Sequence, residues 1–396
     1  MWDSWAFFAS FLPVAACIAV IICVMPAIKL ARVLGVIDQP GGRKQHDRAV
    51  PPIGGLVVFP IFMVLALVAG ADLHSYWSLY VGLIVLLVTG AIDDRHGLNA
   101  WLKFWIQVGV AVLVSVFGGA SVQHLGKLGI GFNDDILWTG WAAWPFTIAA
   151  VVLLINAVNL MDGLDGLASG MSAVMLGWMI VAAIVGGDVG QALVVGVLVG
   201  ALCGFLVFNM RNPWRRKASV FLGDAGSMCL GLALGWFAIH LAQWPGMPLA
   251  PVSVAWIIAL PVFDACAQFY RRVREGRHPF SPDRGHFHHH FINAGLSVRV
   301  TTPIILGLVF VMGGFGYLGV VAGVPELLML VLWGGALLAH MAISYRPARY
   351  VRLISTLVGR QVFAVDGEGK AEGKSVDRDV SSSSDRGDKL PKQDAA

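Results

Sequence analysis

The 396-residue chain is 57% hydrophobic and only 13% charged, and its mean hydropathy is +0.74. An ordinary soluble domain carries about a quarter charged residues, so this composition excludes a soluble globular protein and indicates an integral membrane protein. The formal net charge of +4 gives no reason to expect a nucleic-acid partner, because basic residues in such a protein reflect topology and attraction to membrane lipids.

Apolar runs long enough to cross a bilayer recur along most of the chain. A hydrocarbon core of roughly 30 Å needs about 20 apolar residues in a helix. Eleven runs approach this length, at residues 5–28, 53–71, 76–92, 101–119, 141–158, 166–187, 190–210, 226–243, 251–270, 301–323 and 325–344. We therefore expect an all-α, polytopic bundle of about 11 transmembrane helices over residues 1–345. A cytoplasmic tail, residues 346–396, would follow and be disordered from about residue 366.

The first apolar run is expected to remain in the membrane. It is too long for a cleaved signal peptide, it starts with an acidic residue, Asp3, and it lacks a basic region before it. The five cysteines all lie within apolar runs without the spacing of metal ligands. This pattern indicates buried thiols and no disulfides.

Lysine and arginine are distributed unevenly between the two sets of loops. The loops that follow the first, third, fifth, seventh and ninth spans hold seventeen of these residues when Lys103, at the start of the fourth run, is counted with them, whereas the opposite loops hold Lys127 alone. The remaining ten lie in the C-terminal tail. The positive-inside rule then places the N-terminus outside and the C-terminus in the cytoplasm. With this topology, every dense polar cluster lies on the cytoplasmic face.

The first cytoplasmic loop reads "DQPGGRKQHDRAVPPIGG". It combines Arg43, Lys44 and His46 with glycine pairs that would let the backbone approach a ligand. Retention of the loop in the cytoplasm explains its basic residues equally well. By itself, this loop does not decide between ligand binding and cytoplasmic retention as the reason for its basic residues.

The second cluster, "AIDDRHGLNAWLKF", holds adjacent Asp93 and Asp94 at the end of the third span. Like charges this close to hydrocarbon need a cation, a proton or a nearby base. A helix-end salt bridge to Arg95 would meet this need, and so would a cation-binding or catalytic role. Further acids on the same face favour the second interpretation.

The third cluster, "NLMDGLDGLASG", places Asn159, Asp162 and Asp165 at three-residue spacing after an apolar run. In a helix these residues share one face, and Asn156 extends the row backwards. Asp165 could instead cap the next helix. That alternative leaves the amide and the other carboxylate unexplained, so we expect a ligand-binding face.

The fourth cluster is "FLGDAGS", residues 221–227, preceded by the basic residues Arg211, Arg215, Arg216 and Lys217. Glycines around Asp224, followed by a helix whose N-terminal amides are free, suit a phosphate with its metal ion. A simple tight turn would also explain the glycines.

The fifth cluster, "RRVREGRHPFSPDRGHFHHHF", spans residues 271–291 and contains His286, His288, His289 and His290. Histidines at this density are typical of zinc or iron sites. However, no cysteine lies near them, the histidine-rich box does not recur, and five arginines share the loop. Anion binding or proton transfer is therefore favoured.

Together these loops contain the groups that phosphate chemistry requires. Carboxylates and an amide can hold Mg²⁺, which prefers a few oxygen ligands together with substrate phosphates. Arginine, lysine and histidine can neutralise charge on a transferred or departing phosphate. A secondary transporter and a lipid oxidase built on the histidines are the alternatives, but acids clustered at one face without an internal repeat disfavour transport.

The ordered motifs "RKQH…PPIGG", "DDR", "NAVNLMDGLDGLA", "FLGDAGS" and "SPDRGHFHHHF" resemble those of the polyprenyl-phosphate N-acetylhexosamine-1-phosphate transferases. This superfamily includes the bacterial WecA-like and TagO-like enzymes and, more distantly, the MraY translocases. The resemblance covers residues 25–295. It implies a fold of about ten or eleven helices with a cytoplasmic active site.

Carried onto this sequence, the resemblance implies one metal site and two sets of functional residues. Mg²⁺, with Mn²⁺ as an alternative, would be held by Asp224 with help from Asn159. The catalytic set comprises Asp93, Asp94, Asp162, His286, His288 and His289. The substrate-binding set comprises Lys44, Asn156, Asp165, Asn209, Phe221, Arg272 and Arg284. In this set the Phe221 ring would stack on uracil, and Asn209 would contact the nucleotide.

In "SPDRGHFHHH", an aspartate and an arginine precede the histidines, as in the WecA type. The resemblance therefore favours UDP-GlcNAc over UDP-MurNAc-pentapeptide. The expected reaction transfers a sugar-1-phosphate from a UDP-N-acetylhexosamine to undecaprenyl phosphate in the bacterial inner membrane, releasing UMP and starting a surface polysaccharide such as O antigen. The sequence leaves open the N-acetyl sugar, the polysaccharide, a one-step or two-step mechanism, and a homodimer.

Overall fold

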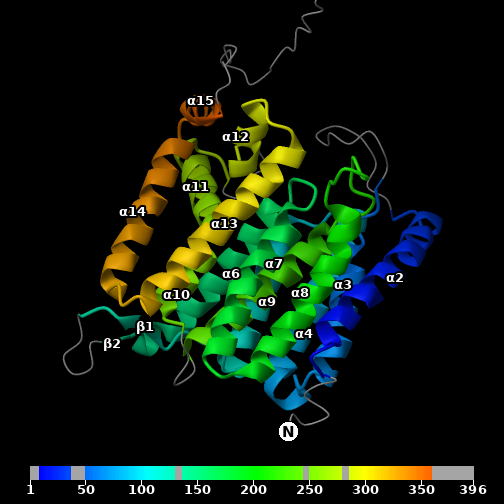
Figure 1. The fold of residues 1–396 in the computed structure, drawn as a ribbon, viewed down its shortest axis with the longest axis horizontal. Coiled ribbons are helices and arrows are strands. Elements are labelled where there is room, and N and C mark those ends of the chain that lie inside the picture. The colour runs from blue at the N-terminus through cyan, green and yellow to red at the C-terminus, as the bar shows by residue number, and fades with distance from the viewer. Residues whose placement is uncertain (1–8, 37–49, 130–135, 244–248, 279–284, 359–396) are drawn as a thin grey trace, which may run out of the picture.

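The computed structural model describes residues 9–36, 50–129, 136–243, 249–278 and 285–358. Helices make up nearly all of this part of the chain (Figure 1). The elements are α2 (Leu12–Val33), α3 (Gly54–Val68), α4 (Leu73–His96), α5 (Ala100–Val112) with a π-helical end (Leu113–Phe117), β1 (His124–Lys127), β2 (Ile136–Trp138), a 3-10 turn (Gly140–Ala142), α6 (Ala143–Met161), α7 (Leu167–Val185), α8 (Val189–Asn209), α9 (Gly223–Gln243), α10 (Pro251–Ile257), α11 (Ala259–Arg274), α12 (Phe287–Asn293), α13 (Val298–Val321), α14 (Glu326–Ser344) and α15 (Pro347–Leu357).

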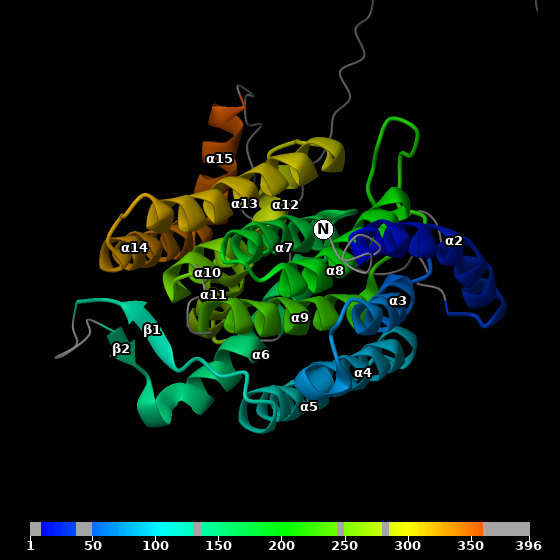
Figure 2. The ribbon, with the colours of Figure 1, turned by 60° about the horizontal axis from the view of Figure 1, so that its bottom comes forward.

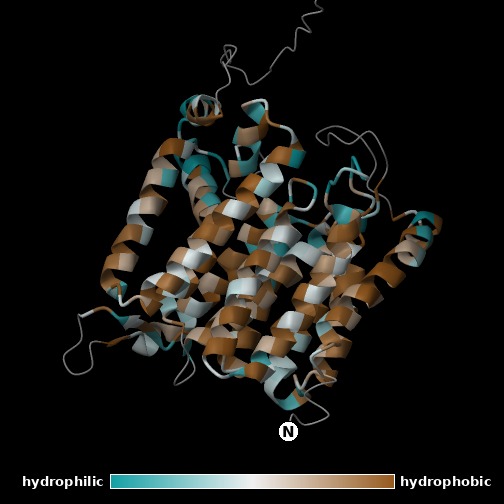
Figure 3. Cartoon of the chain, in the orientation of Figure 1, coloured by the Kyte–Doolittle hydropathy of each residue, from teal (hydrophilic) through white to brown (hydrophobic). Residues whose placement is uncertain are grey.

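The apolar runs of the sequence are found as helices. In the described residues, nine helices are long and apolar enough to cross a membrane, and the bent pair α10 and α11 makes a tenth candidate span. The 15-residue α3 is shorter but also apolar. Figure 3 shows apolar residues along the length of these helices. The prediction of an all-α, multi-pass membrane protein is confirmed.

The ninth predicted span is broken. α10 and α11 meet at an angle of 73°. Pro261 lies in the first turn of α11 and has no N–H to donate to the carbonyl of Ile257, four residues earlier. The helix therefore breaks at Ile258, between α10 and α11.

Helix α9 lies at the centre of the bundle, in contact with α3, α4, α6 and α7 (Figure 2). Small residues allow these close contacts, as in many membrane bundles. A Cβ on Gly55 of α3 would meet the main chain of Gly226, and a Cβ on Gly90 of α4 would meet that of Ala225. Both glycine pairs of the loop before α3 were expected to let backbone approach a ligand. The backbone of Gly55 approaches α9, and the other pair, Gly41 and Gly42, lies outside the described residues.

Helices α12 and α15 and the loop of residues 210–222 lie at one end of the bundle, which we call the polar end (Figure 1). The antiparallel hairpin of β1 and β2 lies at the opposite end, with His124 paired to Trp138. The start of the predicted tail forms α15, whose Tyr350 ring lies 4.6 Å from that of His290 on α12. The predicted disorder from residue 366 falls outside the described residues.

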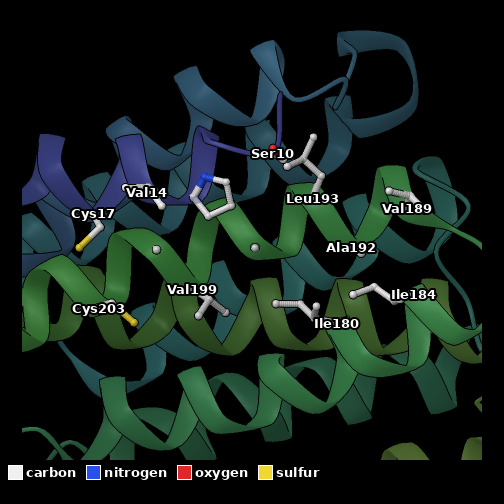
Figure 4. Close-up of a pocket in the computed structure, with 13 residues that line it drawn as sticks. Ser10, Val14, Cys17, Ile180, Ile184, Val189, Ala192, Leu193, Val199 and Cys203 are labelled. Atoms are coloured by element: carbon white, nitrogen blue, oxygen red, sulfur yellow. The ribbon is translucent and has the colours of Figure 1, made fainter. Parts of the chain in front are cut away.

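An apolar groove of about 560 Å³ lies between α2, α7 and α8 (Figure 4). Side chains such as Val14, Ile184 and Val199 line it. These residues come from the ends of α2, α7 and α8 that lie away from the polar end. Because its lining is almost wholly apolar, the groove offers no groups for phosphate chemistry.

Candidate active site

The acidic end of α4 meets the start of α9. Asp94 Oδ1 accepts the main-chain N–H of Asp224 at 2.9 Å, and its Oδ2 accepts that of Ala225 at 3.3 Å. Asp94 therefore satisfies amides that no carbonyl within α9 can pair with. The sequence predicted that these amides would be free for a phosphate. That prediction is wrong, because a carboxylate from another helix occupies them.

Lys103, in the first turn of α5, joins two of the acids. Its Nζ lies 2.6 Å from Asp93 Oδ2 and 3.0 Å from Asp224 Oδ2. The alternative in which the aspartate pair is neutralised by Arg95 is wrong, since Asp93 pairs with Lys103. Sequence reasoning missed this lysine as a site residue. The available signal was a single cation inside an apolar run, which marks a functional position by default.

Asn159, in the last turn of α6, also reaches Asp224. Its Nδ2 donates to Asp224 Oδ1 at 3.1 Å and to Ser227 Oγ at 2.8 Å. The sequence predicted that this amide and this carboxylate would share one site. The structure brings them together, and the amide oxygen is the Asn159 atom able to ligate a cation.

Asp162 ends α6 and belongs to the same cluster. Within the described part of the chain, its carboxylate has no hydrogen-bond partner. Burial raises the pKa of Asp162 to about 8, and the negative charges of Asp224, Asp94 and Asp165 act in the same direction. Of the acids around α9, Asp162 is therefore the one most available to a proton, a cation or a substrate.

The balance of charge in this cluster calls for a cation. Among the described residues, the carboxylates Asp93, Asp94, Asp162 and Asp224 face only the ammonium of Lys103, which leaves three negative charges in excess when all are ionised. No three His, Cys, Asp or Glu side chains of the described residues form a complete metal site. Mg²⁺ needs no such site, since it takes one or two protein carboxylates together with water and substrate phosphates. The donor set therefore fits a cation that arrives with a phosphate.

A second group of residues fixes the loop between α6 and α7. Asp165 Oδ2 accepts from Arg211 Nε at 2.6 Å and from the N–H of Ala218 at 3.1 Å. The alternative in which Asp165 caps α7 is wrong, because the start of α7 has no side-chain cap. The N-cap residue is Gly166, whose backbone is in the left-handed conformation with φ 77°. Asp165 instead ties this loop to the one before α9.

Asn209 is buried beneath the same loop. Its Oδ1 accepts the N–H of Gly166 at 2.8 Å, and its Nδ2 donates to the carbonyl of Val220 at 2.9 Å. Both ends of the amide therefore bond to main chain. In this arrangement Asn209 supports the two loops, and a contact to the nucleotide would require these bonds to change.

The histidines reach the cluster through His288. This side chain is 1% exposed, and neither ring nitrogen has a partner among the described residues. Burial lowers the pKa of His288 well below its ordinary value, and the neighbouring histidines add to this effect, so the ring is neutral at physiological pH. A Cβ on Gly163 would collide with the imidazole. The loop between α6 and α7 therefore lies directly against His288.

The other histidines surround His288. The ring of His289 lies 4.3 Å from it. His286 lies parallel to it at 5.8 Å, and its Nε2 is 3.3 Å from Arg272 Nη2. Burial lowers the pKa of His290 to about 4. The sequence was right to group these side chains with the arginine.

The remaining predicted residues lie at the edges of the site or outside the described chain. Asn156 lies one turn deeper in α6, where its Nδ2 donates to Gln107 Oε1 at 2.6 Å. Phe221 is partly buried, and its N–H donates to the carbonyl of Pro51 at 3.0 Å. Lys44 and Arg284 fall outside the described residues.

Comparisons with known proteins show the family of the chain. Residues 76–242 match the model of the glycosyl transferase family 4. The undecaprenyl-phosphate alpha-N-acetylglucosaminyl 1-phosphate transferase of Escherichia coli strain K12 is 33% identical over 84% of this chain and 91% of its own length. The enzyme of the same name in Yersinia pestis is 32% identical over 82% and 89%. A probable undecaprenyl-phosphate N-acetylglucosaminyl 1-phosphate transferase of Bacillus subtilis is 32% identical over 73% and 80%.

Proposed function

Because the chain belongs to the glycosyl transferase family 4 enzymes, we propose that it transfers GlcNAc 1-phosphate from UDP-GlcNAc to undecaprenyl phosphate. The products are a lipid-linked diphospho-sugar and UMP, and the reaction begins the synthesis of a cell-surface polysaccharide. One observation carries the proposal: carboxylates from α4, from the end of α6 and from α9 converge at the polar end. The relatives of this chain are named undecaprenyl-phosphate alpha-N-acetylglucosaminyl 1-phosphate transferases. Both substrates can meet there, the lipid from the bilayer and the nucleotide sugar from the cytoplasm.

The chemistry is a displacement at phosphorus. An oxygen of the lipid phosphate attacks the β-phosphorus of the nucleotide sugar, and the bond from this phosphorus to the bridging oxygen of the α-phosphate breaks. The departing oxygen keeps the electron pair, and UMP leaves. Such reactions depend on positioning and charge stabilisation.

Asp162 is the acid best placed to hydrogen-bond the lipid phosphate. A phosphate monoester loses its second proton with a pKa of about 6, whereas burial raises the pKa of Asp162 to about 8. At neutral pH the phosphate is therefore a dianion, and Asp162 carries a proton that it can donate to a phosphate oxygen in a hydrogen bond. Asp93, Asp94 and Asp224 are each tied to Lys103 or to the amides of α9.

A magnesium ion would be held by Asp224 and by the amide oxygen of Asn159. When bound, it would neutralise the charge of the diphosphate that the carboxylates otherwise repel. Lys103 would remain beside Asp93 and keep that carboxylate in place. His288 is a candidate hydrogen-bond donor to the sugar or the diphosphate, because it is neutral and its ring nitrogens are unpaired.

Two experiments test the reaction. The first offers purified protein a panel of UDP-sugars with undecaprenyl phosphate and measures UMP: rapid release with UDP-GlcNAc supports the proposal, and preference for another sugar or no release refutes it. The second omits the lipid. Stoichiometric UMP release with a phosphosugar bound to the protein would replace direct attack with a two-step route through an aspartyl-phosphate.

The same proposal includes an orientation in the inner membrane. The seventeen basic residues in alternate loops support an orientation with the polar end in the cytoplasm and the N-terminus outside. Single cysteines introduced at Gln123 in the hairpin and at Trp214 at the polar end should react with an impermeant thiol reagent from opposite sides of the membrane. Labelling of both from outside intact cells would refute this orientation.

A further inference from the structure

A carboxylate outside the acidic cluster lies beneath the histidines. Asp264, on α11, is fully buried in an apolar helix pair. Placing a charge there is costly unless it is fully hydrogen-bonded, and such residues in membrane helices usually serve a function. No role was predicted for Asp264 from the sequence.

Asp264 binds both the side chain and the main chain at the start of α12. Its Oδ2 lies 2.9 Å from His286 Nδ1, and its Oδ1 accepts the N–H of Phe287 at 2.8 Å. One turn further along α11, Gln268 donates to the carbonyl of Gly285 at 2.7 Å. These bonds hold the three residues that precede His288.

The partners of His286 determine its tautomer. A carboxylate only accepts hydrogen bonds, so Nδ1 carries the hydrogen that faces Asp264. The guanidinium of Arg272 only donates, so Nε2 accepts from it. Both ring nitrogens are therefore engaged, and His286 connects a buried carboxylate to a buried arginine.

We propose that Asp264 is a positioning residue for the transfer reaction and that His286 acts as its connector rather than as an acid or base. Through His286, Asp264 holds Arg272; through the N–H of Phe287, it sets the start of α12 and so the place of His288. This inference rests on the proposed function. It adds to that function a buried carboxylate, Asp264, and gives His286 a structural role in place of a catalytic one.

Substitutions at His286 separate the two roles. In His286→Gln, the amide supplies one donor and one acceptor, so both bonds can be kept, whereas His286→Ala supplies neither. We expect His286→Ala to lower kcat on the order of 10- to 100-fold, as loss of an orienting partner does, and His286→Gln to recover most of that loss. A glutamine variant as inactive as the alanine variant would overturn the proposal, since an amide cannot transfer protons as imidazole does.

Asp264→Asn gives an independent readout. The asparagine oxygen can still accept the N–H of Phe287, but the amide then turns its N–H toward His286 Nδ1. His286 must adopt the other tautomer, in which Nε2 carries the hydrogen and faces the N–H donors of Arg272. We expect kcat to fall on the order of 10- to 100-fold while KM for undecaprenyl phosphate is unchanged. A wild-type kcat in this variant would overturn the proposal.

The control is Tyr76→Phe, which removes a partly buried hydrogen bond to Gln191 near the opposite end of α4. It should keep the wild-type kcat. If Asp264→Asn does not fold, as judged by gel filtration in detergent, the pair of His286 variants decides the question. Absence of UMP release by the wild type would refute the proposed function itself. If the wild type is active, the activities of the variants test only the roles of Asp264 and His286.

Discussion

Asp94, two residues before the last residue of α4, accepts the N–H of Asp224, the second residue of α9, at 2.9 Å. Two acids 130 positions apart are thus joined through a hydrogen bond between a side chain and the main chain. The bond holds two carboxylates together without requiring either to be protonated. It also orients the start of α9, where Asp224 meets Lys103 and Asn159.

Asp94→Ala should lower the free energy of unfolding by about 1 to 2 kcal/mol, the usual effect of removing a helix cap. Asp94→Asn should keep most of this stability, because an asparagine oxygen also caps well, yet lose activity with the charge. Asp72→Ala is the matched control: Asp72 caps the other end of α4, so its loss should lower stability and spare activity. Thermal unfolding in detergent gives the stability, and equal stability of Asp94→Ala and wild type would contradict the capping role.

Lys103→Met should make the protein depend more strongly on a divalent cation. Without the ammonium, Asp93 and Asp224 lose their shared positive partner. We expect the free energy of unfolding to fall by on the order of 1 to 3 kcal/mol, which is less than for a fully buried pair because Asp224 is 30% exposed. Mg²⁺ should restore more stability in this variant than in the wild type. Lys127→Met, at the opposite end, should show no such difference; identical Mg²⁺ responses in both variants would count against the site.

Gly163→Ala should impair activity because the added Cβ collides with the imidazole of His288. Gly177 on α7 is the matched control, since a Cβ there meets no neighbouring atom within 4 Å. Gly177→Ala should be neutral or stabilise the helix by up to about 1 kcal/mol. The comparison is made on kcat for UMP release. Wild-type kcat in both variants would show that the loop and His288 do not need to touch.

The pKa of Asp162 gives stability a defined dependence on pH. The pKa is raised from 3.8 in the unfolded chain to about 8 in the fold, so the folded protein retains a proton that the unfolded chain has released. Its contribution to stability is full below about pH 4 and is lost as pH rises to about 8. In a chelator, the melting temperature of the wild type should fall more steeply from pH 5 to pH 8 than that of Asp162→Asn. Parallel curves would rule out the raised pKa.

The helices could be predicted from the sequence because the bilayer imposes a length and a polarity on every span. Each predicted run corresponds to a helix or, for residues 251–270, to a bent pair. The bend was not predicted, although Pro261 carries its cause. Helix α15 was not predicted either, because its eleven residues are too few and too polar to form a membrane span, and Tyr350 meets α12 only in the folded protein.

Most residues of the site could be predicted from the sequence, but the hydrogen bonds and ion pairs between them could not. Asp94, Asn159 and Asp224 could be grouped, because polar residues at the ends of apolar runs must lie near the membrane surface. Their pairing could not, since Lys103 and Asp264 each lie inside an apolar run and find their partners only after α5 and α11 pack. A single ionisable residue in such a run is the signal that both positions share.

The central claim is that one site at the polar end transfers a phosphosugar to a lipid phosphate. The most direct test supplies UDP-GlcNAc labelled in the sugar, undecaprenyl phosphate and Mg²⁺ to purified wild type and to Asp224→Asn, and measures UMP and labelled lipid. We predict equal amounts of both products from the wild type, and neither from an Asp224→Asn variant that is folded. Normal turnover in that variant, or UMP without labelled lipid, would contradict the claim.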